Sequence, residues 1–114
     1  MKLIIQKDQA KKLLGGISFE LRAKVELDQN ESSLVSKYKA DKTILMSKSL
    51  RIPFTDKTIP LEITIGSLVS GQVFSSSDIG EILETEKIVI EACENFKNYI
   101  EVMNSFGGEE IHEF

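Results

Sequence analysis

The sequence predicts an α+β fold: a mostly antiparallel sheet with one short helix and a long C-terminal helix packed on one face. Three observations lead to this prediction. One segment alternates between apolar and polar residues over eleven positions, the last third of the chain has apolar residues at helical spacing, and 114 residues is close to the usual size of one domain. Since no repeat or linker divides the chain, we expect residues 1–114 to form a single α+β domain.

The alternating segment runs from Ile17 to Leu27, with apolar residues at every odd position. This period indicates a strand with one buried and one solvated face, as in an antiparallel sheet covered on one side. Residues 3–5 are expected to form the strand that pairs with it. The residues between them fit either a helical turn, capped by Asp8 and ended by Gly15, or a long irregular hairpin.

A short helix is predicted after this strand. Asp28 and Glu31 have the spacing of an N-cap and the acid that supports it, and the helix is expected to reach about Lys39. Its small apolar face consists of Leu34, Val35 and Tyr38.

The middle of the chain predicts shorter elements. Residues 43–47 are a weaker strand candidate, and Pro53 and Pro60 bracket an expected loop. Residues 61–65 alternate again, and Val73 and Phe74 follow a Ser-Gly pair at residues 70–71. We therefore predict a hairpin that closes near this pair.

A long helix is predicted over residues 78–106, about 43 Å long at about 1.5 Å per residue. Asp78 repeats the capping pattern, and Gly107 stops the helix. Its main apolar row consists of Ile79, Ile82, Leu83, Val89, Ile90, Cys93, Phe96, Ile100 and Met103. Residues 109–114 are a candidate for a last short strand.

A second apolar row makes this helix too broad to be buried on one side alone. The row consists of Ile88, Ala92, Tyr99, Val102 and Phe106. We expect it to form a homodimer interface, because two-fold homodimers are the commonest soluble oligomers. Alternatively, the short helix near residues 31–39 and the loop at residues 48–60 cover the row, or Gly80 breaks the helix.

The net charge of −4 is unevenly distributed. Residues 1–60 contain twelve Lys/Arg and seven Asp/Glu, whereas residues 61–114 contain two Lys and eleven Asp/Glu. This asymmetry indicates either a basic functional face and an acidic partner surface, or two halves that pack together and neutralise each other.

The sequence contains no recognisable catalytic constellation, and we predict a protein that is not an enzyme and has no cofactor or metal. Its single histidine, His112, lies in an acidic tail. If the protein were an enzyme, a divalent-cation site in this tail would be the active site that the sequence fits least badly. Its single cysteine, Cys93, lies on the apolar side of the predicted helix beside Glu91 and Glu94, which favours a core role and a raised thiol pKa.

The alternative to a protein-binding role is a site for a small anionic ligand or nucleotide. Gly15 and Gly16 follow two lysines but lack the spacing of a phosphate-binding P-loop, so they indicate a turn or, less specifically, an anion-binding nest. The residues predicted for this site are Lys11, Lys12, Gly15, Gly16, Arg22 and Arg51.

We expect no nucleic-acid partner, because Arg22 and Lys24 alternate with Glu20 and Glu26 and no aromatic residue stands among them. We expect no membrane association, since no apolar run approaches about 20 residues. The absence of a signal-peptide core and of a cysteine pair predicts a cytoplasmic location. The leading prediction is a small soluble binding or adaptor protein that acts as a homodimer through its C-terminal helix.

Overall fold

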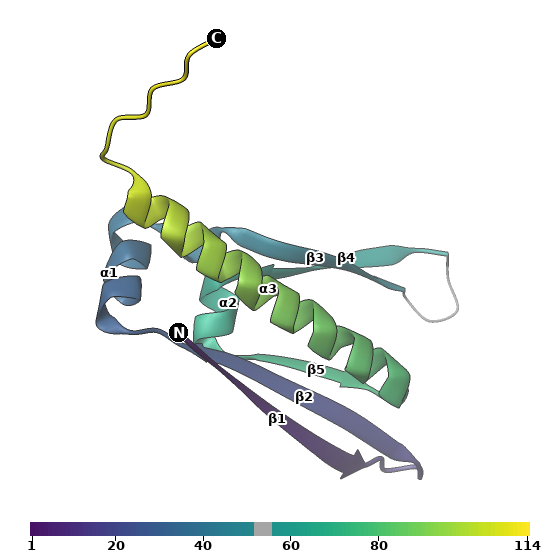
Figure 1. Cartoon of the computed structure of the whole chain (residues 1–114). Helices are drawn as coiled ribbons and strands as arrows, with labels where there is room; N and C mark the ends of the chain where they lie inside the picture. Colours follow the sequence, from purple (N-terminus) through teal and green to yellow (C-terminus); the bar gives the residue numbers. More distant parts are fainter. Residues whose placement is uncertain (52–55) are drawn as a thin grey trace.

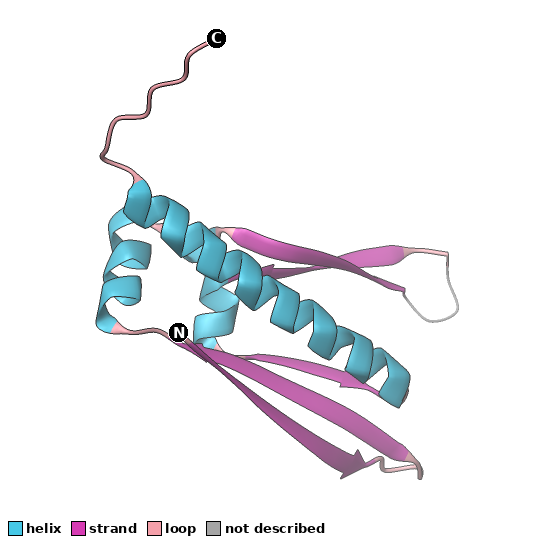
Figure 2. Cartoon of the chain, in the orientation of Figure 1, coloured by secondary structure: helices cyan, strands magenta, loops and turns pink. Residues whose placement is uncertain are grey.

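A computed structural model describes residues 1–51 and 56–114. In chain order the elements are β1 (Lys2–Lys11), β2 (Ile17–Glu26), α1 (Gln29–Tyr38), the 3-10 turn η1 (Ala40–Lys42), β3 (Ile44–Arg51), β4 (Thr58–Thr64), α2 (Ile65–Ser70), β5 (Gln72–Ser76) and α3 (Ile79–Ser105). Figures 1 and 2 show α3 running between the β1–β2–β5 sheet and the β3–β4 hairpin. The predicted α+β class, with antiparallel sheets and a long C-terminal helix against them, is confirmed.

β2 is the central strand of the three-stranded sheet. β1 pairs antiparallel with it along all ten of its residues, and β5 pairs antiparallel on the other side. The alternation of β2 buries Leu21, Ala23 and Val25 almost completely, while Arg22 and Lys24 stay exposed on the opposite face. The strand prediction for residues 17–27 is therefore confirmed, with the strand ending one residue earlier.

The segment between the first two strands is a hairpin and not a helical turn. β1 continues through Lys11, and Asp8 lies within the strand opposite Glu20 instead of capping a helix. The Gly15 N–H donates to the Lys12 carbonyl at 3.1 Å to close the turn. Polar residues can extend β1 because backbone groups make the hydrogen bonds of an antiparallel ladder.

The predicted hairpin over residues 61–74 is wrong. β4 pairs with β3, residues 65–70 form α2, and β5 crosses to pair with β2. Thr64 and Ser67 form a reciprocal capping box that starts α2, and Ile65 and Leu68 are buried. Gly66 is required there, since a Cβ on it would lie 2.8 Å from the Asp41 carbonyl oxygen of η1.

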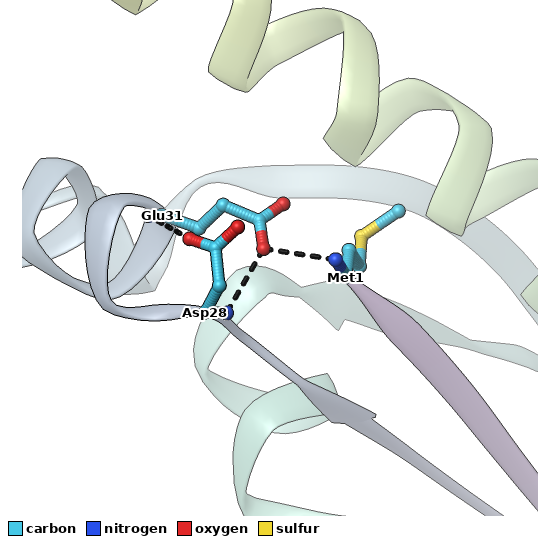
Figure 3. A network of polar contacts seen from close by, with 3 residues as sticks. All are labelled: Met1, Asp28 and Glu31. Carbon is cyan, nitrogen blue, oxygen red and sulfur yellow. Dashed lines mark hydrogen bonds and ion pairs between the residues drawn. The ribbon is translucent and has the colours of Figure 1, made fainter.

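The capping pattern predicted for α1 is present. The Glu31 N–H donates to Asp28 Oδ1 at 2.7 Å, and the Asp28 N–H donates to Glu31 Oε1 at 3.0 Å. The amino group of Met1 lies 3.0 Å from the same Glu31 oxygen (Figure 3). The start of α1 is thus tied to the start of β1.

The β3–β4 hairpin is longer than the sequence indicated. The weak strand candidate at residues 43–47 becomes the eight residues of β3. Pro60 lies in β4 opposite Ser49 and not at the end of a loop, which is possible because each strand of a two-stranded sheet has a free edge. Pro53 lies outside the described residues.

α3 provides the larger part of the core. It has 27 residues, and Gly80 lies in its first turn without breaking it. Its buried face contacts β2, β5, β3 and α1. The buried residues are Ile82, Thr85, Val89, Ala92, Cys93, Phe96, Ile100 and Met103.

The predicted last strand over residues 109–114 is wrong. After the turn at Gly107, whose φ is +118°, the chain leads away from both sheets and meets no strand edge (Figure 1). The tail and the two projecting hairpins make the molecule elongated, with extents of 63 × 33 × 21 Å. Its radius of gyration is 17.5 Å, compared with about 13 Å for a compact domain of about 100 residues.

Candidate functional site

One side of α3 is held against β3 by side-chain hydrogen bonds. Lys48 Nζ donates to Thr85 Oγ1 at 2.7 Å, and Asn95 Nδ2 donates to the Leu45 carbonyl at 3.0 Å. β3 therefore lies along the side of the helix on which the sequence placed a second apolar row.

Because of this contact, some residues of the row predicted as a homodimer interface are buried within the chain and others are exposed. Ala92 is fully buried, and Ile88 and Tyr99 are half-buried against the core of their own chain. Val102 and Phe106 remain in solvent, with 53% and 73% of their surface exposed. The alternative named the short helix near residues 31–39 and the loop at residues 48–60 as the cover for this row. In the structure β3 lies along this side of α3, and α1 also contacts α3.

The opposite side of α3 is open and also apolar. Ile79, Leu83 and Ile90 are 54%, 48% and 42% exposed, although the sequence grouped them with the core row. We call these three residues the α3 stripe. Glu86 lies between them by helical spacing, and its Oε2 is 2.6 Å from Lys7 Nζ of β1. The stripe therefore faces the β1 side of the sheet, and Ile79 and Leu83 lie near Lys7.

A groove lies where the stripe approaches the hairpin. Its volume is about 170 Å³, and it is lined by Lys7, Asp8, Gln9, Phe19, Glu20, Ile79, Ile82 and Leu83. Small-molecule sites usually measure about 300 Å³ or more. The groove is of a size for one or two side chains of a partner.

β1 is an edge strand beside this groove. Among the residues that the structure describes, only β2 pairs with β1, so its other edge is free. The ten-residue pairing has no register shift, and the strand contains no proline. A long, regular edge of this kind can pair with another chain.

The β1–β2 turn presents two leucines. Leu13 and Leu14 are essentially fully exposed, while Gly15 and Gly16 have φ angles of +90° and +87°. These positive angles explain the glycines, and the pattern fits a three-residue hairpin loop. The Gly-Gly pair thus acts in a turn, and the Gly15 N–H, which an anion-binding nest would use, already donates to Lys12.

The structure does not gather the six residues predicted for an anionic ligand. Lys11, Lys12 and the two glycines lie together at the hairpin tip. Arg22 is six residues from Gly16 along β2, about 20 Å away, and its Nη2 lies 3.7 Å from Glu20 Oε2. Arg51 is the last residue of β3, in the other sheet.

The titratable residues considered for catalysis are placed as follows. Cys93 is buried, and burial, with a smaller effect of Glu94, raises the pKa of its thiol to about 11. His112 Nε2 lies 3.2 Å from Glu110 Oε2 in the exposed tail. In the described ranges no group of three or more His, Cys, Asp or Glu side chains could hold a metal ion. No helix there has the length and apolarity needed to cross a membrane.

The sequence could not separate the α3 stripe from the core, because helical spacing alone places both near the same face. The unbroken edge of β1 was missed because residues 6–11 are polar except for Ala10 and do not alternate. The sequence did contain one signal of an exposed apolar surface at the hairpin. Leu13 and Leu14 come directly before two glycines, and leucines in a turn have no core beside them.

Comparison of the chain with protein-family models, with curated proteins and with solved structures yields no match.

Proposed function

We propose that the protein is a small non-enzymatic binding or adaptor protein that acts as a homodimer through α3. One observation carries the proposal: outside its buried face, α3 and its cap leave large apolar side chains in solvent. These are Ile79, Leu83, Ile90, Val102 and Phe106. Burial of apolar surface contributes roughly 25 cal/mol per Å² to the stability of a complex, so a partner that covers these side chains stabilises the complex.

The shape and chemistry of the chain support this proposal. An elongated molecule with projecting hairpins offers more surface to a partner than a compact one of the same length. The side chains best suited to nucleophilic or acid–base chemistry are a buried thiol and a tail histidine. These features favour binding over catalysis.

The proposal is tested by sedimentation equilibrium over a wide concentration range. Two paired variants examine the two apolar parts of α3: Leu83→Ser/Ile90→Ser for the stripe, and Val102→Ser/Phe106→Ser for the exposed part of the predicted row. We expect a wild-type dimer whose Kd rises about tenfold or more, which corresponds to about 1.4 kcal/mol, in at least one of them.

A matched control is available on the outer face of the sheet. Val73 is 52% exposed, almost the same as the 53% of Val102, but it lies on β5 facing away from α3. Val73→Ser should leave the Kd unchanged. A wild-type monomer, or a dimer that neither α3 pair weakens, would contradict the proposal.

A further inference from the structure

We propose that the free edge of β1 joins two copies of the chain into one continuous antiparallel sheet, with Ile5 on the two-fold axis and Lys2 facing Asp8 of the second copy. The inference rests on the homodimer proposed above and specifies the strand and the register of its interface.

The edge of β1 has the properties that pairing requires. Sheet edges carry unpaired N–H and C=O groups, and proteins protect them with proline, bulges, short strands or charges. β1 has no proline and no bulge, and it is ten residues long. Its protection is limited to charged side chains, and Lys7, on the helix side, is already neutralised by Glu86 at 2.6 Å.

Symmetry restricts the possible registers. A two-fold axis perpendicular to the sheet makes the two β1 strands antiparallel and keeps each side chain on its original face. Facing residues are then both odd or both even in number, because successive side chains alternate between faces. The register is therefore fixed by the residue that lies on the axis.

The charges of β1 select one register. An axis at Lys7 or Asp8 places identical charges opposite each other, and an axis at Gln9 places Lys7 opposite Lys11 twice. An axis at Gln6 makes no charge pair. An axis at Ile5 places Lys2 opposite Asp8 twice, once on each side of the axis. Opposite charges directly across a ladder stabilise it, and like charges destabilise it.

The α3 stripe lies on the correct side to extend this interface. The Lys7–Glu86 ion pair places the stripe beside β1, and the axis puts both helices on the same face of the joined sheet. A standard interface buries about 800 Å² per partner, roughly a tenth of the 8390 Å² of accessible surface of this chain. The seven paired residues of β1 lack the apolar area for an interface of this size, and the stripe supplies it.

Disulfide trapping tests the axis. In an antiparallel ladder, facing residues have Cα atoms about 4.5–5.5 Å apart, within the range of a disulfide. Oxidation of Ile5→Cys should give a covalent dimer in most of the protein. Gln9→Cys lies on the same face but far from the axis, and the wild-type chain has only the buried Cys93. Both controls should remain uncrosslinked.

Charge exchange tests the register independently of any cysteine. Lys2→Glu and Asp8→Lys should each raise the dimer Kd roughly fivefold or more, since each creates two repulsive pairs. The double variant Lys2→Glu/Asp8→Lys restores both pairs and should return to within about twofold of wild type. Lys11→Glu makes the same charge change where no residue of the second β1 faces it, and should have no effect.

The outcomes separate the two proposals. A wild-type dimer that shows neither selective crosslinking at position 5 nor rescue in the double variant overturns the β1 pairing and leaves the α3 homodimer intact. If Ile5→Cys fails to fold, the charge series alone decides. A wild-type monomer overturns both proposals and leaves the β1 edge to a different protein.

Discussion

At the scale of single residues, Cys93 shows how burial governs reactivity. The thiolate is the nucleophile of a cysteine, and this thiol has a pKa of about 11 because burial disfavours its charged form. We predict that Cys93 reacts much more slowly with a thiol reagent such as iodoacetamide in native protein at pH 8 than after unfolding in urea. Equal rates in the two states would show that the helix does not bury this side chain.

The same pKa gives a pH dependence with a definite sign. An unfolded thiol titrates near pH 9, so between about pH 9 and 11 the folded chain holds a proton that the unfolded chain loses. Its contribution is complete below about pH 9 and is lost as pH rises towards 11. The stability difference between wild type and Cys93→Ala, measured by urea unfolding, should therefore shift in favour of Cys93→Ala as pH rises through this range; a difference independent of pH would contradict the assignment.

At the scale of elements, the start of α1 depends on Asp28. Its carboxylate accepts the Glu31 N–H at 2.7 Å, a bond that satisfies a helix N–H with no intrahelical partner. Asp28→Ala should lower the free energy of unfolding by about 1 kcal/mol in urea titrations. Asn30→Ala, an exposed position in the same turn, is the control and should change it by less than about 0.5 kcal/mol.

α3 should depend most on the centre of its buried face. Phe96 is 1% exposed, so Phe96→Ala removes a large apolar side chain and leaves a cavity. The expected loss is about 3–5 kcal/mol, measured by denaturant unfolding at fixed protein concentration. Phe114→Ala makes the same change in a fully exposed tail residue and should have almost no effect. Similar losses in the two variants would contradict the packing of α3.

Local signals predicted the elements that local physics determines. The alternation of residues 17–27 sets β2, and the Asp28/Glu31 pair sets α1, because a two-residue period and a cap are properties of neighbouring residues. α2 was missed because residues 61–65 alternate like a strand, whereas the Thr64–Ser67 capping box begins a helix inside this pattern. Which strand pairs with β5 depends on tertiary structure, and no local sequence pattern indicates it.

At the scale of the whole molecule, the position of α3 between two sheets determines which of its surfaces is available. β3 lies along one side and the sheet lies below, so Ala92 is buried whereas Val102 and Phe106 are not. The sequence indicates that the apolar surface of α3 is too wide to be buried by one contact. It does not indicate which side of the helix β3 covers. The exposed stripe beside β1 follows only from the assembled structure.

The arrangement of charge is also a property of the whole chain. The Lys7–Glu86 ion pair joins the basic first part to the acidic second part across the β1–α3 contact. Arg22 pairs with Glu20 on the same strand, and the Met1 amino group pairs with Glu31 at the start of α1, so both of these ion pairs lie within the first part. The two predicted possibilities, neutralisation between the halves and a charged partner surface, therefore both remain predictions.

The central claim, a homodimer through α3, is tested most directly by sedimentation equilibrium of the wild-type chain beside Leu83→Ser/Ile90→Ser, Val102→Ser/Phe106→Ser and Val73→Ser. We predict that wild type and Val73→Ser form dimers of equal Kd, and that at least one α3 variant dissociates at concentrations where they do not. A wild-type chain that sediments as a monomer at every concentration, or a dimer unaffected by both α3 variants, would contradict the account.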